Sequence, residues 1–307
     1  MITLEKRRLG RTGMRPKVLA LGCAPLHRPD RTDDEAVAAV RRAIELGWNY
    51  LDTSPYYGQS ERRLGLALEG GWREKVFLQT KTGSHPQRPY DYSAEATRWS
   101  VENSLKVMKT EYLDAVLIHD PSDIEDPLRP GRCLDELLKM KEKGIVRHIG
   151  LGVRSHEFHK RFIETGHCEL VLTYFDYTLL DQSVAKTTLP LARKHDVGIE
   201  LGSVLGAGLL TGQEPRNHPR AHAMWEWCRD RNVFAASAGR TAGLCGKNTG
   251  VSLRQLALHF CMAAKIDGVV LVGCGTRQHV EDVHREATTE VPVEVWRDFR
   301  AQFGVGI

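Results

Sequence analysis

The sequence predicts a (β/α)8 barrel (a TIM barrel), formed as one domain by residues 1–307. Short runs rich in Val, Ile and Leu alternate with longer helical patterns, which is typical of parallel strands joined by crossover helices. Eight such runs occur, the number that closes this barrel, and the fold commonly takes about 250 residues or more as a single domain. A hydrophobic content of 41% supplies the core that such a domain needs.

The eight predicted strands are short and apolar, and helical patterns separate them. They are Val18–Gly22, Tyr50–Thr53, Val76–Thr80, Ala115–His119, His148–Gly152, Leu170–Tyr174, Gly198–Leu201 and Val269–Val272. Two of the intervening helices have clear boundaries, because Asp33–Leu46 follows the cap residue Thr32 and stops at Gly47, and Ser93–Met108 opens at a serine.

Two glycine-rich segments lie outside this alternation. Leu9–Met14 precedes the first strand and is predicted to turn as a short β-hairpin that plugs one end of the barrel. The segment from Gly202 to Asn217 follows the seventh strand, so it belongs to the face where the loops after the strands build the active site.

Composition narrows the class of protein. A net charge of +4 with no long basic run argues against nucleic acid or a membrane surface as partner, and no stretch is long and apolar enough to span a membrane. The N-terminus lacks the apolar core of a signal peptide, and the seven cysteines form an odd set without a CxxC pair. Reduced thiols and a cytoplasmic location are therefore expected.

Histidine pairs do not indicate a metal site. His156 and His159 lack the HExxH spacing, and His218 and His222 have no evident third ligand. Surface histidines are the expected interpretation, and no metal is predicted.

Four polar residues fall at the predicted ends of adjacent strands, where side chains point into the barrel mouth. Asp52 ends the second strand, Tyr57 follows it in a loop, Lys81 comes after the third strand and His119 ends the fourth. A buried lysine needs an anion beside it, which Asp52 can supply. A cationic Lys81 near the phenol is expected to lower the pKa of Tyr57, so that Tyr57 can carry a proton to or from a substrate oxygen.

In this combination of motifs the chain resembles the aldo-keto reductases. The segments that carry the resemblance are Gly47–Glu61, Lys81, His119, Arg147–Gly150 and Leu205–Gly212, in that order. The resemblance implies a barrel that transfers a hydride between NAD(P) and a carbonyl or alcohol. It also implies a catalytic tetrad of Asp52, Tyr57, Lys81 and His119, with Tyr57 as general acid or base.

The nicotinamide side departs from the usual family pattern. Gly152 and Val153 stand where many members have a Ser-Asn pair, Tyr174 stands where a glutamine is common, and Gly202 replaces an aromatic residue. Together with the segment 173–180, these departures resemble the sugar 1-dehydrogenase branch, such as the L-fucose and L-galactose dehydrogenases. That branch oxidises the anomeric hydroxyl of a free aldose.

The remaining predicted contacts concern the dinucleotide and the substrate. The cofactor-binding residues are predicted to be Tyr174, Ser203, Leu205, Gly208, Gly273 and Arg277, and the substrate-binding residues Trp48, Tyr56, Asp120 and Arg154. Glycines after the seventh strand allow close approach of a pyrophosphate, and a helix start follows Gly273. Because Glu281 and Asp282 follow Arg277 closely, NAD is favoured over NADP.

Two alternatives stay open from the sequence. One is an NADPH-dependent aldehyde or ketone reductase, because sequence does not fix the direction of the reaction. The other is a nucleotide-sensing binding protein without catalysis, since function does not follow from fold. The presence of Asp52, Tyr57, Lys81 and His119 favours an enzyme acting on a small carbonyl or alcohol, and a sugar dehydrogenase first.

Overall fold

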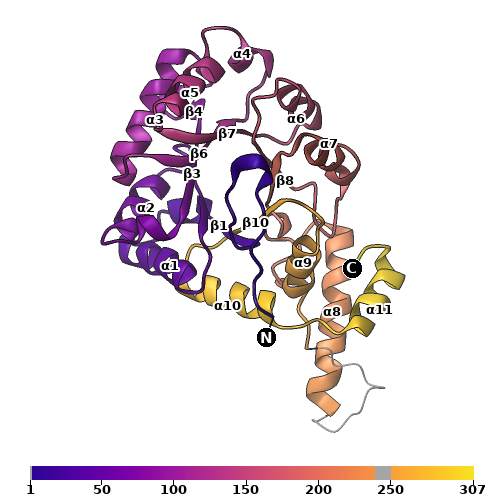
Figure 1. Ribbon diagram of the computed structural model, residues 1–307. Coiled ribbons are helices and arrows are strands. Elements are labelled where there is room, and N and C mark those ends of the chain that lie inside the picture. Colours follow the sequence, from indigo (N-terminus) through magenta and orange to yellow (C-terminus); the bar gives the residue numbers. More distant parts are fainter. Residues whose placement is uncertain (1, 239–249) are drawn as a thin grey trace.

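Eight parallel strands close into a barrel in the computed structural model, which describes residues 2–238 and 250–307 (Figure 1). The barrel strands are β1 (Leu19–Gly22), β2 (Tyr50–Asp52), β3 (Phe77–Thr82), β6 (Leu113–His119), β7 (Val146–Gly152), β8 (Leu170–Tyr174), β9 (Gly198–Gly202) and β10 (Gly268–Gly273). Each pairs with its neighbours in chain order, and β1 closes the ring by pairing with both β2 and β10. The predicted barrel is confirmed.

Helices surround the barrel on its outside (Figure 1). They are α1 (Asp33–Glu45), α2 (Ser60–Leu68), α3 (Ala94–Met108), α4 (Glu125–Leu128), α5 (Cys133–Glu142), α6 (His156–Ile163), α7 (Thr188–His195), α8 (Pro219–Ala238), α9 (Leu253–Met262), α10 (Arg277–Thr288) and α11 (Val293–Phe303). The short 3-10 turns are η1 (Gly10–Thr12), η2 (Ala24–His27), η3 (Arg73–Lys75), η4 (Ser183–Lys186) and η5 (Gly206–Gly208). After β3, the short strands β4 (Ser84–His85) and β5 (Arg88–Pro89) pair with each other outside the barrel. No helix in the described part of the chain is long and apolar enough to cross a membrane.

Helix α1 illustrates how local sequence sets these boundaries. The side chain of Thr32 accepts a hydrogen bond from the backbone N–H of Glu35, and the Glu35 carboxylate accepts one from the backbone N–H of Thr32. This capping box satisfies two amides that the first turn leaves without partners. The helix ends just before Gly47, whose φ of +87° is the left-handed conformation that glycine adopts easily. The predicted start is therefore confirmed, and the end differs by one residue.

The N-terminal plug differs in detail from the predicted hairpin. The chain turns through the 3-10 helix η1, and Lys6 bridges Lys17 in antiparallel fashion without an extended ladder. Gly10 sits so close to β9 that a Cβ there would lie 2.2 Å from the backbone nitrogen of Gly198. The neighbouring Leu9 is fully buried inside the barrel. The turn therefore closes the N-terminal end of the barrel, as predicted.

The barrel interior becomes more polar toward its C-terminal mouth. Alternate residues of a strand share one face, so on β9 Gly198 meets the plug, Glu200 lies in the middle, and Gly202 reaches the mouth. The neighbouring side of the barrel brings Tyr50 and Gln79 to the level of Glu200, with hydrogen bonds among all three. An apolar lower interior thus supports a polar middle, and the open mouth lies above both.

The described cysteines are all buried and without disulfides: Cys23, Cys133, Cys168, Cys228, Cys261 and Cys274. Cys245 lies outside the described residues. Burial raises the pKa of each of these six thiols. They therefore behave as small apolar core residues rather than as thiolates.

Candidate active site

The C-terminal mouth of the barrel contains a cavity of about 540 Å³. Parallel strands end at the same edge, so residues from all eight barrel strands and from several of the loops after them meet around this space. All four predicted catalytic residues line it: Asp52, Tyr57, Lys81 and His119. The structure therefore brings together residues that are up to 67 positions apart in sequence, from Asp52 to His119.

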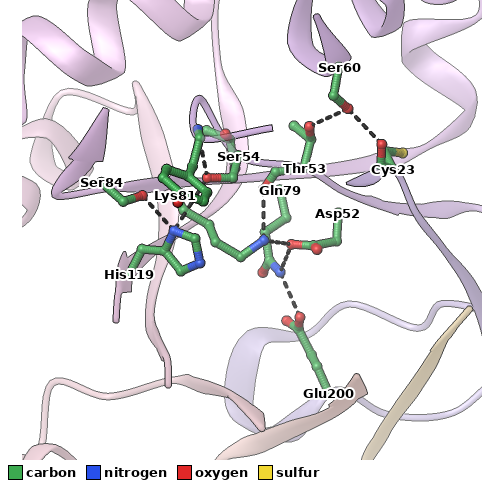
Figure 2. Close-up of polar contacts among 12 residues, drawn as sticks. Cys23, Asp52, Thr53, Ser54, Ser60, Gln79, Lys81, Ser84, His119 and Glu200 are labelled. Carbon is green, nitrogen blue, oxygen red and sulfur yellow. Dashed lines mark hydrogen bonds and ion pairs between the residues drawn. The ribbon is translucent and has the colours of Figure 1, made fainter. Parts of the chain in front are cut away.

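Lys81 forms a buried ion pair with Asp52, as predicted. Its side chain is only 1% exposed, and its Nζ donates hydrogen bonds to Oδ1 of Asp52 at 2.6 Å and to the carbonyl of Thr53 at 2.8 Å (Figure 2). Burial disfavours the ammonium form, but attraction to Asp52 and Tyr57 more than offsets this, so the pKa of Lys81 is raised. Lys81 is therefore a fixed positive charge in the cavity floor.

Tyr57 lies between this charge and an imidazole. The Nζ of Lys81 is 4.9 Å from the centre of the Tyr57 ring, and the ring meets His119 edge-on with 6.1 Å between centres. Burial raises the pKa of Tyr57 above its ordinary value, and Lys81 lowers it by less than burial raises it. The expected lowering of the Tyr57 pKa below its ordinary value is thus wrong, because desolvation outweighs the neighbouring cation.

His119 is held as a neutral side chain. Its Nδ1 is hydrogen-bonded to the hydroxyl of Ser84 at 2.5 Å and lies 3.3 Å from that of Ser54 (Figure 2). Burial, together with the charge of Lys81, holds the pKa of His119 well below its usual range. A neutral imidazole with its Nδ1 engaged is oriented to offer its Nε2 to a ligand.

Asp120 and Tyr174 form a second polar pair on the cavity wall. The Tyr174 hydroxyl donates to Oδ1 of Asp120 at 3.0 Å, and Oδ2 lies 3.5 Å from Nε2 of His119. Burial raises the pKa of the Asp120 carboxyl, although Tyr174 and Lys81 favour its ionised form. The pair supplies hydrogen-bonding groups next to His119.

Backbone strain concentrates at the same mouth. Asp120, Phe175 and Ser203 each follow directly after a barrel strand, and each adopts a positive φ, of +41°, +66° and +50° respectively. Non-glycine residues rarely adopt this conformation, and such positions cluster at functional sites. All three line the cavity.

Glycines form the opposite wall of the cavity. Gly22, Gly202 and Gly273 end the neighbouring strands β1, β9 and β10, whereas Gly152, at the end of β7, pairs with His119 on the catalytic side. At Gly22 a Cβ would make only ordinary contacts, of 3.6 Å with Gly273. The absence of side chains here leaves room for a flat ring beside Lys81 and Tyr57, so the residues present fit a nicotinamide.

Five of the six predicted cofactor-binding residues line the cavity: Tyr174, Ser203, Leu205, Gly208 and Gly273. Arg277 does not line it. Its side chain is 62% exposed at the start of α10, and its Nε donates to Glu281 at 3.0 Å. Glu281 also pairs with Arg42.

The predicted substrate residues divide into two groups. Tyr56 and Asp120 line the cavity, and Tyr56 is 62% exposed at its rim. The prediction that Trp48 binds substrate is wrong. Trp48 is fully buried, and its indole N–H donates to Nδ1 of His284, away from the mouth. Arg154 is exposed and faces Asp181 at 3.5 Å without lining the cavity.

Several residues that contact the predicted catalytic residues were not found from the sequence. Ser54 and Ser84 orient His119, yet serines in loops carry no distinctive pattern. Gln79 and Glu200 lie under Asp52. An acidic residue inside the otherwise apolar strand Gly198–Gly202 is the signal that would have found Glu200.

The histidines considered for a metal are occupied by other partners. His156 bonds to Asp176 and Thr187, and His159 to Thr188 and the carbonyl of Val153. Among the residues that the structure describes, no three metal-ligating side chains come together.

Comparison with known proteins agrees with this geometry. The model of the Aldo/keto reductase family matches residues 18–301. The chain is 31% identical to L-galactose dehydrogenase of Arabidopsis thaliana over 92% of this chain and 88% of that protein. It is 26% identical to D-threo-aldose 1-dehydrogenase of a Pseudomonas species over 87% of both.

A solved structure shows the same fold. An aldo-keto reductase from Bacillus halodurans, in its holo form, superposes with a TM-score of 0.73 at 22% identity over 98% of this chain and 96% of that one. The barrel, the matched family model and the relatives thus agree over nearly the whole chain. The chain belongs to the aldo/keto reductase family and is an NAD(P)-dependent oxidoreductase.

Proposed function

We propose that this protein oxidises a free aldose, or a similar polyol, at the anomeric carbon, with Tyr57 as the general base. The observation that carries the proposal is the position of Tyr57 between the Lys81 ammonium and the His119 imidazole, in a cavity that Gly22, Gly202 and Gly273 also line. A phenol in this position can take the proton of a hydroxyl bound between it and the imidazole.

A bound nicotinamide would supply the hydride chemistry, accepting the hydride from the substrate carbon. The residues that would hold it are Gly202, Ser203 and Gly273, with Tyr174 nearby. His119, neutral and with its Nδ1 engaged, directs Nε2 to the substrate oxygen. Lys81 favours the phenolate of Tyr57 once the proton is taken, because a positive charge stabilises the negative phenolate.

A sugar suits the polar part of this cavity. Asp120 and Tyr174 place a carboxylate and a hydroxyl beside His119, where they can bond to neighbouring sugar hydroxyls. The exposed ring of Tyr56 at the rim offers an apolar face to a pyranose. The names of the two relatives, both dehydrogenases of sugars, support the same substrate class.

We further propose NAD rather than NADP as the preferred cofactor. A 2′-phosphate needs free positive charge, but Arg277 is already paired with Glu281, and Glu281 is shared with Arg42. The carboxylate would oppose a phosphate at this end of α10.

The reverse reaction, reduction of an aldehyde or ketone, is the second candidate. The observation that favours it is the raised pKa of Tyr57, which keeps the phenol protonated and ready to act as an acid near neutral pH. A preference for NADPH and for carbonyl substrates would favour this candidate.

The test is the initial rate of nicotinamide reduction with NAD or NADP, for L-galactose and other free aldoses beside simple alcohols. Wild type should turn over a sugar, and Tyr57→Phe should lower kcat by about 10²–10⁴-fold while still binding nucleotide. Tyr112→Phe is the matched control, because Tyr112 precedes β6 at the other end of the barrel. Full turnover in Tyr57→Phe would remove Tyr57 from the mechanism.

A further inference from the structure

The polar network below the Lys81–Asp52 pair is not used by the proposed mechanism. Gln79 donates through Nε2 to Oδ1 of Asp52 at 2.9 Å and to Oε2 of Glu200 at 2.6 Å (Figure 2). The hydroxyl of Tyr50 lies 2.8 Å from Oε1 of Gln79 and 2.8 Å from Oε1 of Glu200. Tyr50, Gln79 and Glu200 are each completely buried.

Counting protons in this triangle favours a protonated Glu200. The amide of Gln79 must direct its NH₂ toward Asp52, because its oxygen would otherwise face the Asp52 carboxylate with no hydrogen between them. Of the two oxygens 2.8 Å from the Tyr50 hydroxyl, Oε1 of Gln79 cannot carry a proton and Oε1 of Glu200 can, so the single Tyr50 proton leaves both contacts satisfied only if it goes to Gln79. The 2.8 Å contact between Tyr50 and Glu200 consequently needs a proton from Glu200. With Glu200 ionised, one pair of oxygens would face each other with no hydrogen between them.

The surroundings agree with a neutral carboxyl. Burial, followed by the negative charge of Asp52, raises the pKa of Glu200 to about 8. The charged groups acting on it are Asp52 from β2 and Lys81 from β3, and the flanking strands β8 and β10 contribute the apolar Leu172 and Leu271 to the same interior. In the described part of the chain, Lys81 forms its ion pair with Asp52 and none with Glu200.

We propose that Glu200 is a positioning residue that carries a proton near neutral pH. Its neutral carboxyl closes the ring of hydrogen bonds that fixes the Gln79 amide against Asp52, and so leaves Asp52 as the one carboxylate that balances Lys81. Loss of the proton to solvent adds a second negative charge under Lys81, which disfavours the phenolate of Tyr57. The effect on Tyr57 rests on the proposed function, whereas the protonation of Glu200 does not.

Infrared difference spectroscopy tests the proton directly, in the full-length protein without substrate or nucleotide. The wild-type spectrum minus that of Glu200→Gln should show a carboxylic-acid carbonyl band near neutral pH that disappears on raising the pH through about 8. The subtraction is needed because Glu61 is buried too, and burial raises its pKa as well. If this band is absent, the proposal is wrong, whatever the enzyme's activity.

Two variants check the network in other ways. Tyr50→Phe removes the hydroxyl that accepts the Glu200 proton, so the band should shift to higher frequency. Glu200→Gln keeps one donor and one acceptor, so its melting temperature should match that of the control Glu142→Gln, a change at an exposed site. A large destabilisation by Glu200→Gln would indicate a carboxylate whose charge stabilises the fold, and would contradict the proposal.

The kinetic test concerns the coupling to Tyr57. Near neutral pH, Glu200→Gln should keep kcat for sugar oxidation within about twofold of wild type, since an amide replaces a neutral acid. Above the Glu200 pKa, the variant should reach its alkaline maximum about one pH unit earlier, because it lacks the added negative charge. Identical pH profiles would overturn the coupling, and the infrared band would still decide the protonation.

Discussion

The two halves of the barrel mouth differ in what their strands present. Strands β2, β3 and β6 contribute Asp52, Lys81 and His119, all buried and bonded to one another or to nearby hydroxyls. Strands β9, β10 and β1 end in glycines, namely Gly202, Gly273 and Gly22, and the other residues that they contribute to the cavity are the apolar Leu271 and Val272 of β10. The first, charged half thus contains the ion pair and the histidine next to Tyr57, and the second, glycine half leaves room for a ligand. We therefore expect changes in the charged half to affect stability and turnover, and changes in the glycine half to affect binding.

The largest effect should follow from Lys81→Met in the charged half. It leaves the Asp52 carboxylate buried without its cation, so the free energy of unfolding should fall by about 3–5 kcal/mol. Activity should fall by about 10²–10⁴-fold, because the Tyr57 phenolate loses its neighbouring cation. Chemical denaturation and steady-state kinetics measure the two losses. Lys106→Met, at an exposed site on α3, is the control and should change stability by less than about 0.5 kcal/mol.

The pH dependence of kcat/KM shows whether Tyr57 or His119 is the group that accepts the substrate proton. Tyr57 must lose its proton before it can accept one, and its pKa is raised, so kcat/KM for oxidation should rise about tenfold per pH unit above neutrality. His119 is neutral throughout, because its pKa lies well below the usual range. A break in the profile near the ordinary histidine pKa would instead assign the titration to His119.

Gly22→Val in the glycine half should affect binding rather than stability. The Cβ has room, but the branched side chain projects into the cavity, so the Kd for nucleotide should rise about tenfold or more, equivalent to about 1.4 kcal/mol. Calorimetric titration measures this, with Gly22→Ala expected to lose less affinity. Unchanged nucleotide affinity in Gly22→Val would mean that this wall does not contact the nucleotide.

The sequence was sufficient for the barrel and for the four residues gathered at its mouth. Alternation placed all eight strands, and polar residues at strand ends identified Asp52, Tyr57, Lys81 and His119. These predictions depend on local pattern and on the common direction of parallel strands, both of which are readable along the chain.

Predictions that depend on how deeply a side chain is buried, or on which distant strands meet inside the barrel, were less successful. Trp48 precedes β2 and is buried against His284, which no local pattern indicates. The direction of the Tyr57 pKa shift depends on how fully the phenol is desolvated, which only the packed structure defines. The Glu200 network requires β2, β3 and β9 to meet across the barrel interior, so it depends on closure of the whole barrel.

The N-terminal plug has a consequence for how the chain folds during synthesis. Leu9 and Gly10 leave the ribosome almost two hundred residues before the backbone they pack against, at Gly198, is made. Until then Leu9 has no interior to enter, and β1 cannot pair with β10. Such distant pairings make folding slow and expose apolar segments. Nascent chains that stop before β9 should therefore depend most strongly on chaperones.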